Sequence, residues 1–317
     1  MTALTQNLFV NPFLLSSIRF STLDLCKLKI YFTKQKLGFT NKLKGETMFI
    51  RILSGIIGLV VLVPLMIIGG VWLQIALMGI IVIAMWELYR AFGDVKAVHF
   101  LALAMAVAYV AFIRADIVVQ IVPIVAVPIL LIVGYMAFDS LRRKPYNPSS
   151  ATIAIFGFFY IAVMLSTVFL VRESIGAFEV WLIFISAWGC DTGAYFSGYL
   201  FGRNKLAPTL SPKKTMEGSI GGTVIATALA AAYGFVLYSI DLRNFGHILV
   251  FALVAFVCSI AGQLGDLAAS AIKRSRDIKD FGNIMPGHGG ALDRFDSIIF
   301  VAPLAFVILY FFGGTLL

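Results

Sequence analysis

A series of long apolar stretches, separated by short polar segments, runs through most of this chain. A helix that crosses a membrane needs about 20 mostly apolar residues. The 317 residues are 60% hydrophobic and only 13% charged, whereas a soluble domain is typically about 45–50% apolar and about 25% charged. The sequence therefore predicts an all-α polytopic membrane protein with about nine transmembrane helices, near residues 52–70, 71–89, 99–113, 117–138, 151–171, 179–200, 218–239, 247–272 and 297–315.

The distribution of basic residues predicts the orientation of these helices. Four alternate loops, 87–98, 139–150, 201–217 and 273–296, together hold fourteen Lys and Arg residues. The loops on the other side hold only Arg114, Arg172 and Arg243. Because cytoplasmic loops of membrane proteins carry an excess of Lys and Arg, we expect the N-terminus and the basic loops to face the cytoplasm.

Two boundaries near the start of the chain depend on weaker signals. No charged residue lies between Arg51 and Glu87, so only Gly69-Gly70 indicates a turn between the first two helices. At Met48 a short basic lead-in is followed at once by an apolar stretch. We therefore expect residues 1–47 to be an N-terminal extension, disordered or upstream of the natural start, and residues 48–317 to be one integral membrane domain.

The formal net charge of +9 is compatible with either of two partners, nucleic acid or anionic lipid. In a membrane protein, such an excess of basic residues usually marks cytoplasmic loops that face anionic lipid headgroups. We therefore expect a membrane lipid surface, and no nucleic acid, as the partner of these charges.

Two acidic residues, Asp191 and Asp266, fall inside apolar stretches. A charge in hydrocarbon costs about 2.5–3.5 kcal/mol on insertion scales, so it needs a partner or water. Asp266 lies seven residues before Lys273 and Asp191 lies ten before Phe201, which places both acids at similar depths below the cytoplasmic ends of their helices. We expect both to face one cytoplasm-facing polar cavity; the alternative is a pair of structural hydrogen bonds between helices.

The segment from Ser270 to Asp296 concentrates charge and glycine in an otherwise apolar chain. It contains the cations Lys273, Arg274, Arg276 and Lys279, the glycines Gly282, Gly287, Gly289 and Gly290, and the acids Asp293 and Asp296 at i, i+3 spacing. Cations and free backbone amides suit phosphate, and carboxylates suit Mg²⁺. A solvated basic loop would explain the Lys and Arg residues but not the glycines or the acids.

His288 lies between Gly287 and Gly289 in this segment. It could donate a hydrogen bond to a phosphate oxygen, act as an acid or fix the loop. A phosphate monoester is already largely ionised near neutral pH, so such a nucleophile needs no strong base. We therefore expect phosphate contact or loop fixing rather than proton transfer.

A second polar segment, Phe201 to Gly222, repeats the pattern. Lys213 and Lys214 follow Ser211-Pro212, and Thr215 and Glu217 lead into the next apolar stretch. The start of that helix offers unpaired backbone amides to an anion. Together the two segments predict a site for a phosphate-rich ligand.

The ordered motifs of these segments closely resemble the signature of phosphatidate cytidylyltransferases, also called CDP-diacylglycerol synthases. The motifs are DxGAY at 191–195, SPKKTxEG at 211–218, GD at 265–266, SxIKR at 270–274, KDxG at 279–282, PxHGG at 286–290 and DRFD at 293–296. They cover roughly residues 190–297; the earlier stretches resemble the family only in hydropathy, and the first 47 residues lie outside the resemblance. Met285 and Ala291 depart from the bulkier apolar residues expected there, which concerns the packing of the loop.

The resemblance implies an enzyme of phospholipid biosynthesis that transfers the cytidylyl group of CTP to phosphatidate, giving CDP-diacylglycerol and pyrophosphate, with Mg²⁺ and with a second cation such as K⁺ as a further possibility. It also implies an integral protein of a bacterial cytoplasmic membrane, with its active site facing the cytoplasm, and a homodimer.

Roles for individual residues follow from the resemblance and from their chemistry. We expect Asp266, Asp293 and Asp296 to be metal ligands, and Asp266, Asp293, Lys273 and His288 to be catalytic. The expected substrate-binding residues are Lys213, Lys214, Arg274, Arg294, Ser270 and Asp191.

Three other interpretations remain open at this point. Intramembrane acids also mark the ion paths of coupled transporters. A relative that acts on another lipid phosphate, or a CDP-alcohol phosphotransferase, is the alternative among enzymes, although the DGxxAR-type run of the latter is missing from the sequence. A non-catalytic scaffold would leave the buried acids unexplained.

Overall fold

Helices make up most of the computed structural model, which describes residues 54–93, 95, 97–113, 150–284 and 289–316. They begin with a short apolar helix, Ser54–Ile68, followed by α2 (Gly70–Ala91) and α3 (Ala97–Phe112). The expected helix 117–138 and the expected extension 1–47 lie outside the described residues. The other expected spans all coincide with helices in the structure.

The second half of the chain alternates α-helix and π-helix before its long helices. One continuous helical run contains α5 (Ser150–Gly157), η1 (Phe158–Val163), α6 (Met164–Leu170) and η2 (Val171–Ile175), and the next contains α7 (Trp181–Phe184), η3 (Ile185–Gly189) and α8 (Cys190–Phe201). A small hairpin of β1 (Lys205–Ala207) and β2 (Ser211–Thr215) precedes α9 (Met216–Ser239), α10 (Gly246–Ser275) and α11 (Leu292–Leu316). This two-stranded hairpin accompanies an otherwise helical structure, which agrees with the expected all-α class.

Five helices among the described residues are long and apolar enough to cross a membrane. They are Gly70–Ala91, Thr152–Ile175, Met216–Ser239, Gly246–Ser275 and Leu292–Phe312. The chain is therefore a mostly helical, polytopic membrane protein, as its hydropathy predicted. The total of nine spans stays a prediction.

The helix Thr152–Ile175 forms the centre of the packing. Its most apolar window is 78% buried, against 33% for α9, and it packs against α2, α3 and α11. Fully buried side chains on this helix, such as Tyr160 and Met164, join Phe300 and Phe306 of α11 in the main apolar core. The peripheral helices instead leave large apolar side chains on their outer faces, where lipid would cover them.

The turn between the first two described helices is fixed by two neighbouring charged residues from η2. Gly69 and Gly70 both have positive φ, 68° and 55°, a backbone conformation that glycine adopts readily. Glu173 accepts a hydrogen bond from the Gly70 amide at 2.8 Å. Arg172 donates to the carbonyl of Met66 at 2.6 Å, so one side chain satisfies the end of a helix and the next satisfies the start of another. The turn predicted at Gly69-Gly70 is confirmed.

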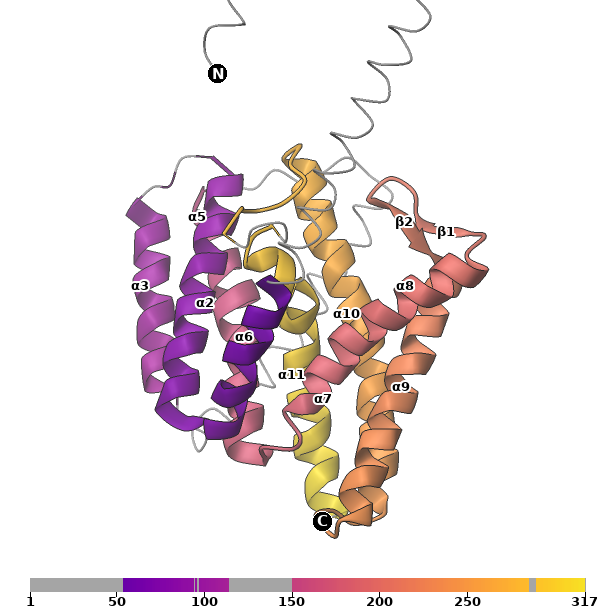
Figure 1. Ribbon diagram of the computed structural model, residues 1–317. Coiled ribbons are helices and arrows are strands. Elements are labelled where there is room, and N and C mark those ends of the chain that lie inside the picture. Colours follow the sequence, from indigo (N-terminus) through magenta and orange to yellow (C-terminus); the bar gives the residue numbers. More distant parts are fainter. Residues whose placement is uncertain (1–53, 94, 96, 114–149, 285–288, 317) are drawn as a thin grey trace, which may run out of the picture. The chain divides into compact units, whose positions relative to one another are not determined.

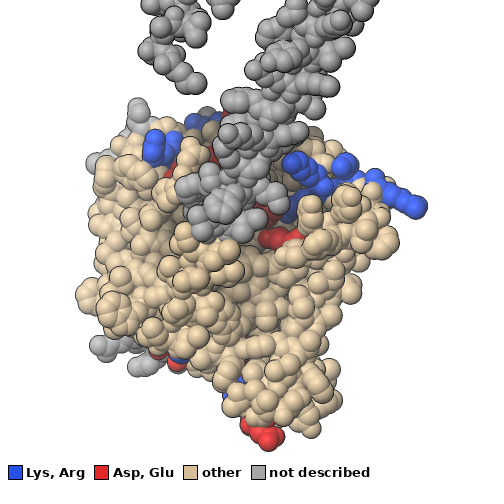
Figure 2. Space-filling model, in the orientation of Figure 1, with Lys and Arg blue, Asp and Glu red and all other residues tan. Residues whose placement is uncertain are grey.

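Charged side chains are distributed unevenly over the described helices. In the space-filling view, the visible Lys and Arg side chains gather mainly at the end where the hairpin lies, above a broad surface without charged residues (Figure 2). At this end α2, α8 and α10 finish, and α9 and α11 begin (Figure 1). The two polar segments singled out in the sequence therefore meet at one end of the protein.

We predict that Gly69→Ala lowers the free energy of unfolding by about 1–2 kcal/mol, because an alanine at positive φ is strained and its Cβ would lie 2.7 Å from the Glu173 carboxylate. The matched control is Gly79→Ala within α2, where a Cβ meets no atom within 4 Å. That change should be neutral or stabilising, since alanine is the better helix former. Thermal unfolding in detergent measures both, and equal effects would contradict the role of the turn.

Candidate functional site

The β-hairpin carries Lys213 and Lys214 and is attached firmly to the neighbouring helices. Ala207 and Leu210 of the hairpin pack against Leu267 and Ala271 of α10 in a small apolar cluster. This cluster packs the hairpin against the part of α10 that directly follows Asp266. The position of the two lysines is therefore determined by apolar packing.

The junction between the hairpin and α9 is fixed by hydrogen bonds. Thr215 is the N-cap of α9, and its hydroxyl accepts a hydrogen bond from the Gly218 amide at 3.1 Å. The Glu217 carboxylate accepts bonds from the Arg203 amide at 3.0 Å and from the Asn204 side chain at 2.8 Å. Thr215 and Glu217, which the sequence placed in the SPKKTxEG motif, thus hold the hairpin in place.

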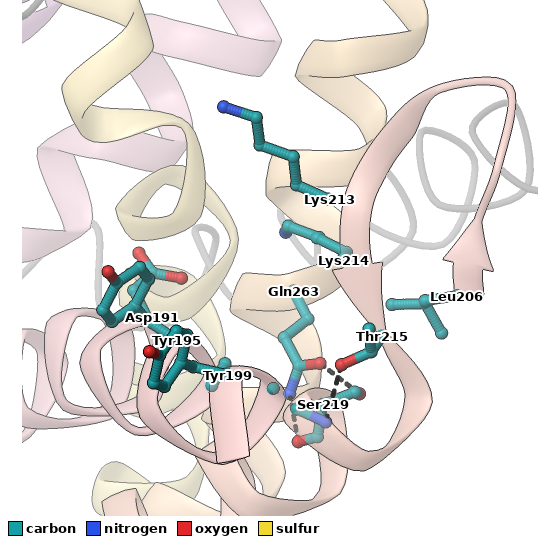
Figure 3. A pocket seen from close by; sticks show the side chains of 12 residues that line it. Asp191, Tyr195, Tyr199, Leu206, Lys213, Lys214, Thr215, Ser219 and Gln263 are labelled. Carbon is teal, nitrogen blue, oxygen red and sulfur yellow. Dashed lines mark hydrogen bonds between the residues drawn. The ribbon is translucent and has the colours of Figure 1, made fainter. Parts of the chain in front are cut away.

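A pocket of about 340 Å³ lies beside the hairpin. Figure 3 shows Asp191, Tyr195 and Tyr199 of α8 on one side of it and the two lysines on the other. Its complete lining is Asp191, Ala194, Tyr195, Gly198, Tyr199, Leu206, Lys213, Lys214, Thr215, Gly218, Ser219 and Gln263. The pocket thus combines cations, a carboxylate and aromatic surface, which suits an anionic ligand that also carries apolar groups.

Lys214 forms an ion pair with Asp266 at the edge of this pocket. Both side chains remain 26% exposed, so the pair is accessible to a ligand. Lys214 also lies within electrostatic range of Asp191 and Asp296. Lys214 therefore contacts the acid of α10 and interacts at longer range with acids of α8 and α11, which are distant in sequence.

The environment of Lys214 keeps its amino group charged. Burial alone would lower the pKa of Lys214, but the charge of Asp266 and its hydrogen bond outweigh this effect. Asp191 and Asp296 act in the same direction, and the pKa of Lys214 is raised above its ordinary value. Lys214 is therefore a permanent cation among carboxylates.

Asp293 belongs to a second network. Its Oδ1 accepts a hydrogen bond from Lys273 Nζ at 2.8 Å, and the side chains are only 2% and 10% exposed. Its Oδ2 accepts bonds from the amides of Phe281 at 2.8 Å and Gly290 at 3.1 Å. Both oxygens of Asp293 are thus engaged in fixing Lys273 and the segment that follows α10.

Asp296 stands between the two networks. It is 8% exposed and accepts a hydrogen bond from the Ser297 amide at 2.8 Å. It lies within electrostatic range of Asp266, Asp191 and Lys273. The i, i+3 spacing groups Asp296 with Asp293. In the structure, however, Asp296 interacts electrostatically with Asp266.

The other predicted site residues lie at different positions. Ser270 directs its hydroxyl at Asp266, 3.5 Å away. Arg274 is exposed and donates to the Ile278 carbonyl at 2.8 Å. Arg294 is exposed and lies within electrostatic range of Asp191. His288 falls outside the described residues, so its predicted role stays a prediction.

Three further polar side chains were missed in the sequence. The amide of Gln263 donates to Thr223 at 3.0 Å and to the Ser219 carbonyl at 3.3 Å, so it joins α9 to α10 one turn before Asp266. The hydroxyl of Tyr160 is buried without a hydrogen-bond partner among the described residues, within electrostatic range of Asp296 and Asp266. The third is Glu87. Gln263 could have been found as a polar residue inside an apolar stretch, whereas Glu87 appears in the sequence only as a charge at the end of a span.

The acids near Lys214 suit a divalent ion only in part. Among the residues that the structure describes, no group of three or more His, Cys, Asp and Glu side chains is arranged to hold a metal ion. Mg²⁺, however, is usually bound by one or two carboxylates together with substrate phosphates. Asp266 and Asp296 would supply such carboxylates once Lys214, which forms an ion pair with Asp266 in this structure, turns away.

We predict that Lys273→Met destabilises the protein by about 3–5 kcal/mol, because it leaves the buried carboxylate of Asp293 without its cation. Arg274→Met provides the matched control from the next position of the same helix, where the side chain is exposed. Thermal unfolding in detergent should show a clearly smaller shift for the control. Equal shifts would mean that the Lys273–Asp293 pair contributes little.

The cytidylyltransferase family model matches residues 49–312 of this chain. A protein of Staphylococcus haemolyticus (strain JCSC1435) named phosphatidate cytidylyltransferase is 33% identical over 268 residues, which cover 83% of this chain and 99% of the relative. Proteins of the same name from Staphylococcus aureus (strain COL) and Bacillus subtilis (strain 168) are each 32% identical, over 83% of this chain and 99% and 98% of the relatives. Because the match covers most of its length and includes all the polar segments described above, this chain belongs to the cytidylyltransferase family.

Proposed function

We propose that this chain is a phosphatidate cytidylyltransferase, which transfers the cytidylyl group of CTP to phosphatidate and releases pyrophosphate. The relatives that carry this name match along almost their whole length. The observation that carries the proposal for the site is the ion pair of Lys214 with Asp266, within electrostatic range of Asp191 and Asp296, beside an aromatic-lined pocket. The site provides both signs of charge that two phosphate substrates and their counterion require.

The reaction brings two anions together. A phosphate oxygen of phosphatidate attacks the α-phosphorus of CTP, a new phosphoanhydride bond forms, and the bond between the α- and β-phosphates breaks. Lys213 and Lys214 would bind phosphate oxygens and reduce the repulsion between the substrates. Arg294 would join them from the start of α11, where it is exposed and close to Asp191.

We propose that Asp266 and Asp296 hold Mg²⁺ in this site, with Asp191 as a further ligand or as the partner of a cation. The ion would neutralise charge on the departing pyrophosphate. The observed contacts of Asp293 favour a different role, since its oxygens already bind Lys273 and two backbone amides. We therefore infer that Asp293 acts by shaping the segment that leads into α11.

The lipid substrate would enter from the side. Tyr195 and Tyr199 line the pocket and are 69% and 80% exposed on α8, so aromatic surface continues from the pocket to the outside of the helices. Aromatic side chains of this kind favour the headgroup level of a bilayer. The phosphate of phosphatidate could thus reach the lysines while its acyl chains remain in the membrane.

We propose further that the site faces the cytoplasm of a bacterial cell, because most basic residues described in the structure lie at this end. Arg172 instead bonds to Met66 and Ile67 just before α2 begins, and Arg243 lies in the loop between α9 and α10, both at the opposite ends of these helices. The predicted homodimer and the second cation such as K⁺ remain proposals from the resemblance.

The proposed activity predicts that membranes containing this chain, given labelled CTP, phosphatidate and Mg²⁺, form a lipid-soluble cytidine product. Asp266→Asn should reduce the rate by at least about 100-fold, because it removes the charge that faces Lys214 and the ion. Asp241→Asn is the control, since Asp241 is exposed in the loop between α9 and α10 and asparagine tolerates its positive φ of 56°. No product from the unaltered protein would refute the function.

The proposed metal site predicts that Lys214→Met binds Mn²⁺ about tenfold more tightly in the absence of nucleotide, because a tethered cation no longer competes for the carboxylates. The same variant should turn over more slowly, because it lacks a phosphate ligand. Lys213→Met is the control: Lys213 is exposed, and its loss should leave Mn²⁺ affinity close to that of the unaltered protein. Weaker Mn²⁺ binding by Lys214→Met would exclude competition at this site.

A further inference from the structure

Glu87 lies near the end of α2 and is almost completely buried, with 3% of its surface exposed. Its carboxylate accepts hydrogen bonds from the amides of Ala291 at 3.1 Å and Leu292 at 2.9 Å. These residues lie more than 200 positions away in the sequence. Glu87 is thus bound to the start of α11, the helix that carries Asp293 and Asp296.

The contact satisfies a specific need of α11. The first four amides of a helix have no partner within the helix, and a negative charge at this end interacts favourably with the helix dipole. Glu87 accepts the amides of Ala291, which directly precedes α11, and of Leu292, its first residue, while Asp293 accepts the Gly290 amide just before them. A carboxylate from α2 therefore completes the capping that the local sequence leaves unfinished.

Two glycines of the segment permit this approach. A Cβ placed on Gly282 or on Gly290 would lie 2.6 Å from the Glu87 carboxyl carbon, closer than any side chain tolerates. The backbone therefore passes directly against the carboxylate. These are two of the glycines whose accumulation marked the polar segment in the sequence.

The beginning of the same segment is also attached to the end of α2. Arg276 donates to the carbonyls of Ala91 at 3.3 Å and Phe92 at 3.2 Å, and its guanidinium lies 5.0 Å from the centre of the Phe92 ring. Arg276 on one side and Ala291 and Leu292 on the other are therefore all bonded to the last turns of α2 or to the residue that follows it. Between these two attachments, the Phe281 amide donates a hydrogen bond to Asp293 at 2.8 Å.

We propose that Glu87 is a positioning residue of the transferase site, which sets the start of α11 and thereby the placement of Asp293 and Asp296 relative to Asp266. The inference rests on the proposed function only where it predicts an effect on the rate of the transferase and on its Mg²⁺ dependence. The geometry that it assigns to Glu87 is independent of the substrate.

The test compares Glu87→Gln with Gly282→Ala. The glutamine keeps the shape of the side chain but loses the charge and one of the two acceptors, and the alanine displaces the carboxylate from the other side. Both should lower kcat by about tenfold or more and raise the Mg²⁺ concentration needed for half-maximal activity, because small displacements of reacting groups are costly. The double variant should be little worse than either single variant, since both changes break one contact.

Glu173→Gln is the matched control at the other end of α2. Glu173 also accepts a helix-terminal amide, that of Gly70 at 2.8 Å, but it lies far from the site. Its substitution should affect unfolding without changing the Mg²⁺ dependence. If Glu87→Gln and Glu173→Gln lose activity only in proportion to folded protein, with unchanged Mg²⁺ dependence, the positioning role is wrong.

Hydrogen exchange provides a measurement that needs no catalysis. In Glu87→Gln, peptides that contain Ala291 and Leu292 should exchange faster, whereas those around Gly70 should not; in Glu173→Gln the order should reverse. Unchanged exchange at Ala291 and Leu292 would overturn the inference even in an active enzyme. Absence of product from the unaltered protein would instead refute the proposed function and leave the exchange result to decide the role of Glu87.

Discussion

Carboxylates placed within an apolar helical protein need partners, and this need organises the whole polar end of the molecule. A buried charge without a partner costs several kcal/mol, and three acids of this end are met by a cation or by backbone amides. Asp266 has Lys214, Asp293 has Lys273 with two amides, and Glu87 has two amides of α11. These contacts link the helices whose ends meet there. The same interactions that make the acids tolerable thus also determine how the helix ends are arranged.

The sequence predicted those features that depend on neighbouring residues. Apolar stretches of membrane-spanning length located the helices, and Gly69-Gly70 located a turn that positive φ values confirm. The polar segments at 211–218 and 270–284 meet at one end of the structure, and Asp191, Ala194 and Tyr195 line the pocket beside the hairpin. Hydropathy and local composition suffice for such features, because each depends on the preference of a short segment for lipid, water or a particular backbone conformation.

The remaining features depend on contacts that no local pattern encodes. Glu87 appeared only as a charge at the end of a span, and its bonds to residues 291 and 292 follow from the packing of α2 against α11. The hairpin was missed because Lys205–Ala207 and Ser211–Thr215 are too short and polar to indicate strands. The role of Tyr160 could not be predicted for the same reason, since its hydroxyl comes within electrostatic range of Asp296 and Asp266 only through the burial of the Thr152–Ile175 helix.

The acids of the site fall into two chemical classes, and the difference suits a transferase. Asp293 and Glu87 bind backbone amides, which cannot leave without unfolding the segment, so these acids define shape. Asp266 binds the end of a long lysine side chain that remains 26% exposed, and such a partner can turn away when a ligand arrives. A site that handles CTP and a lipid phosphate needs both kinds, because the ligand groups have to exchange with each turnover while the backbone that positions them stays fixed. Because Lys273 bonds to Asp293 and also lies within electrostatic range of Asp296, it connects the fixed acids to the exchangeable ones.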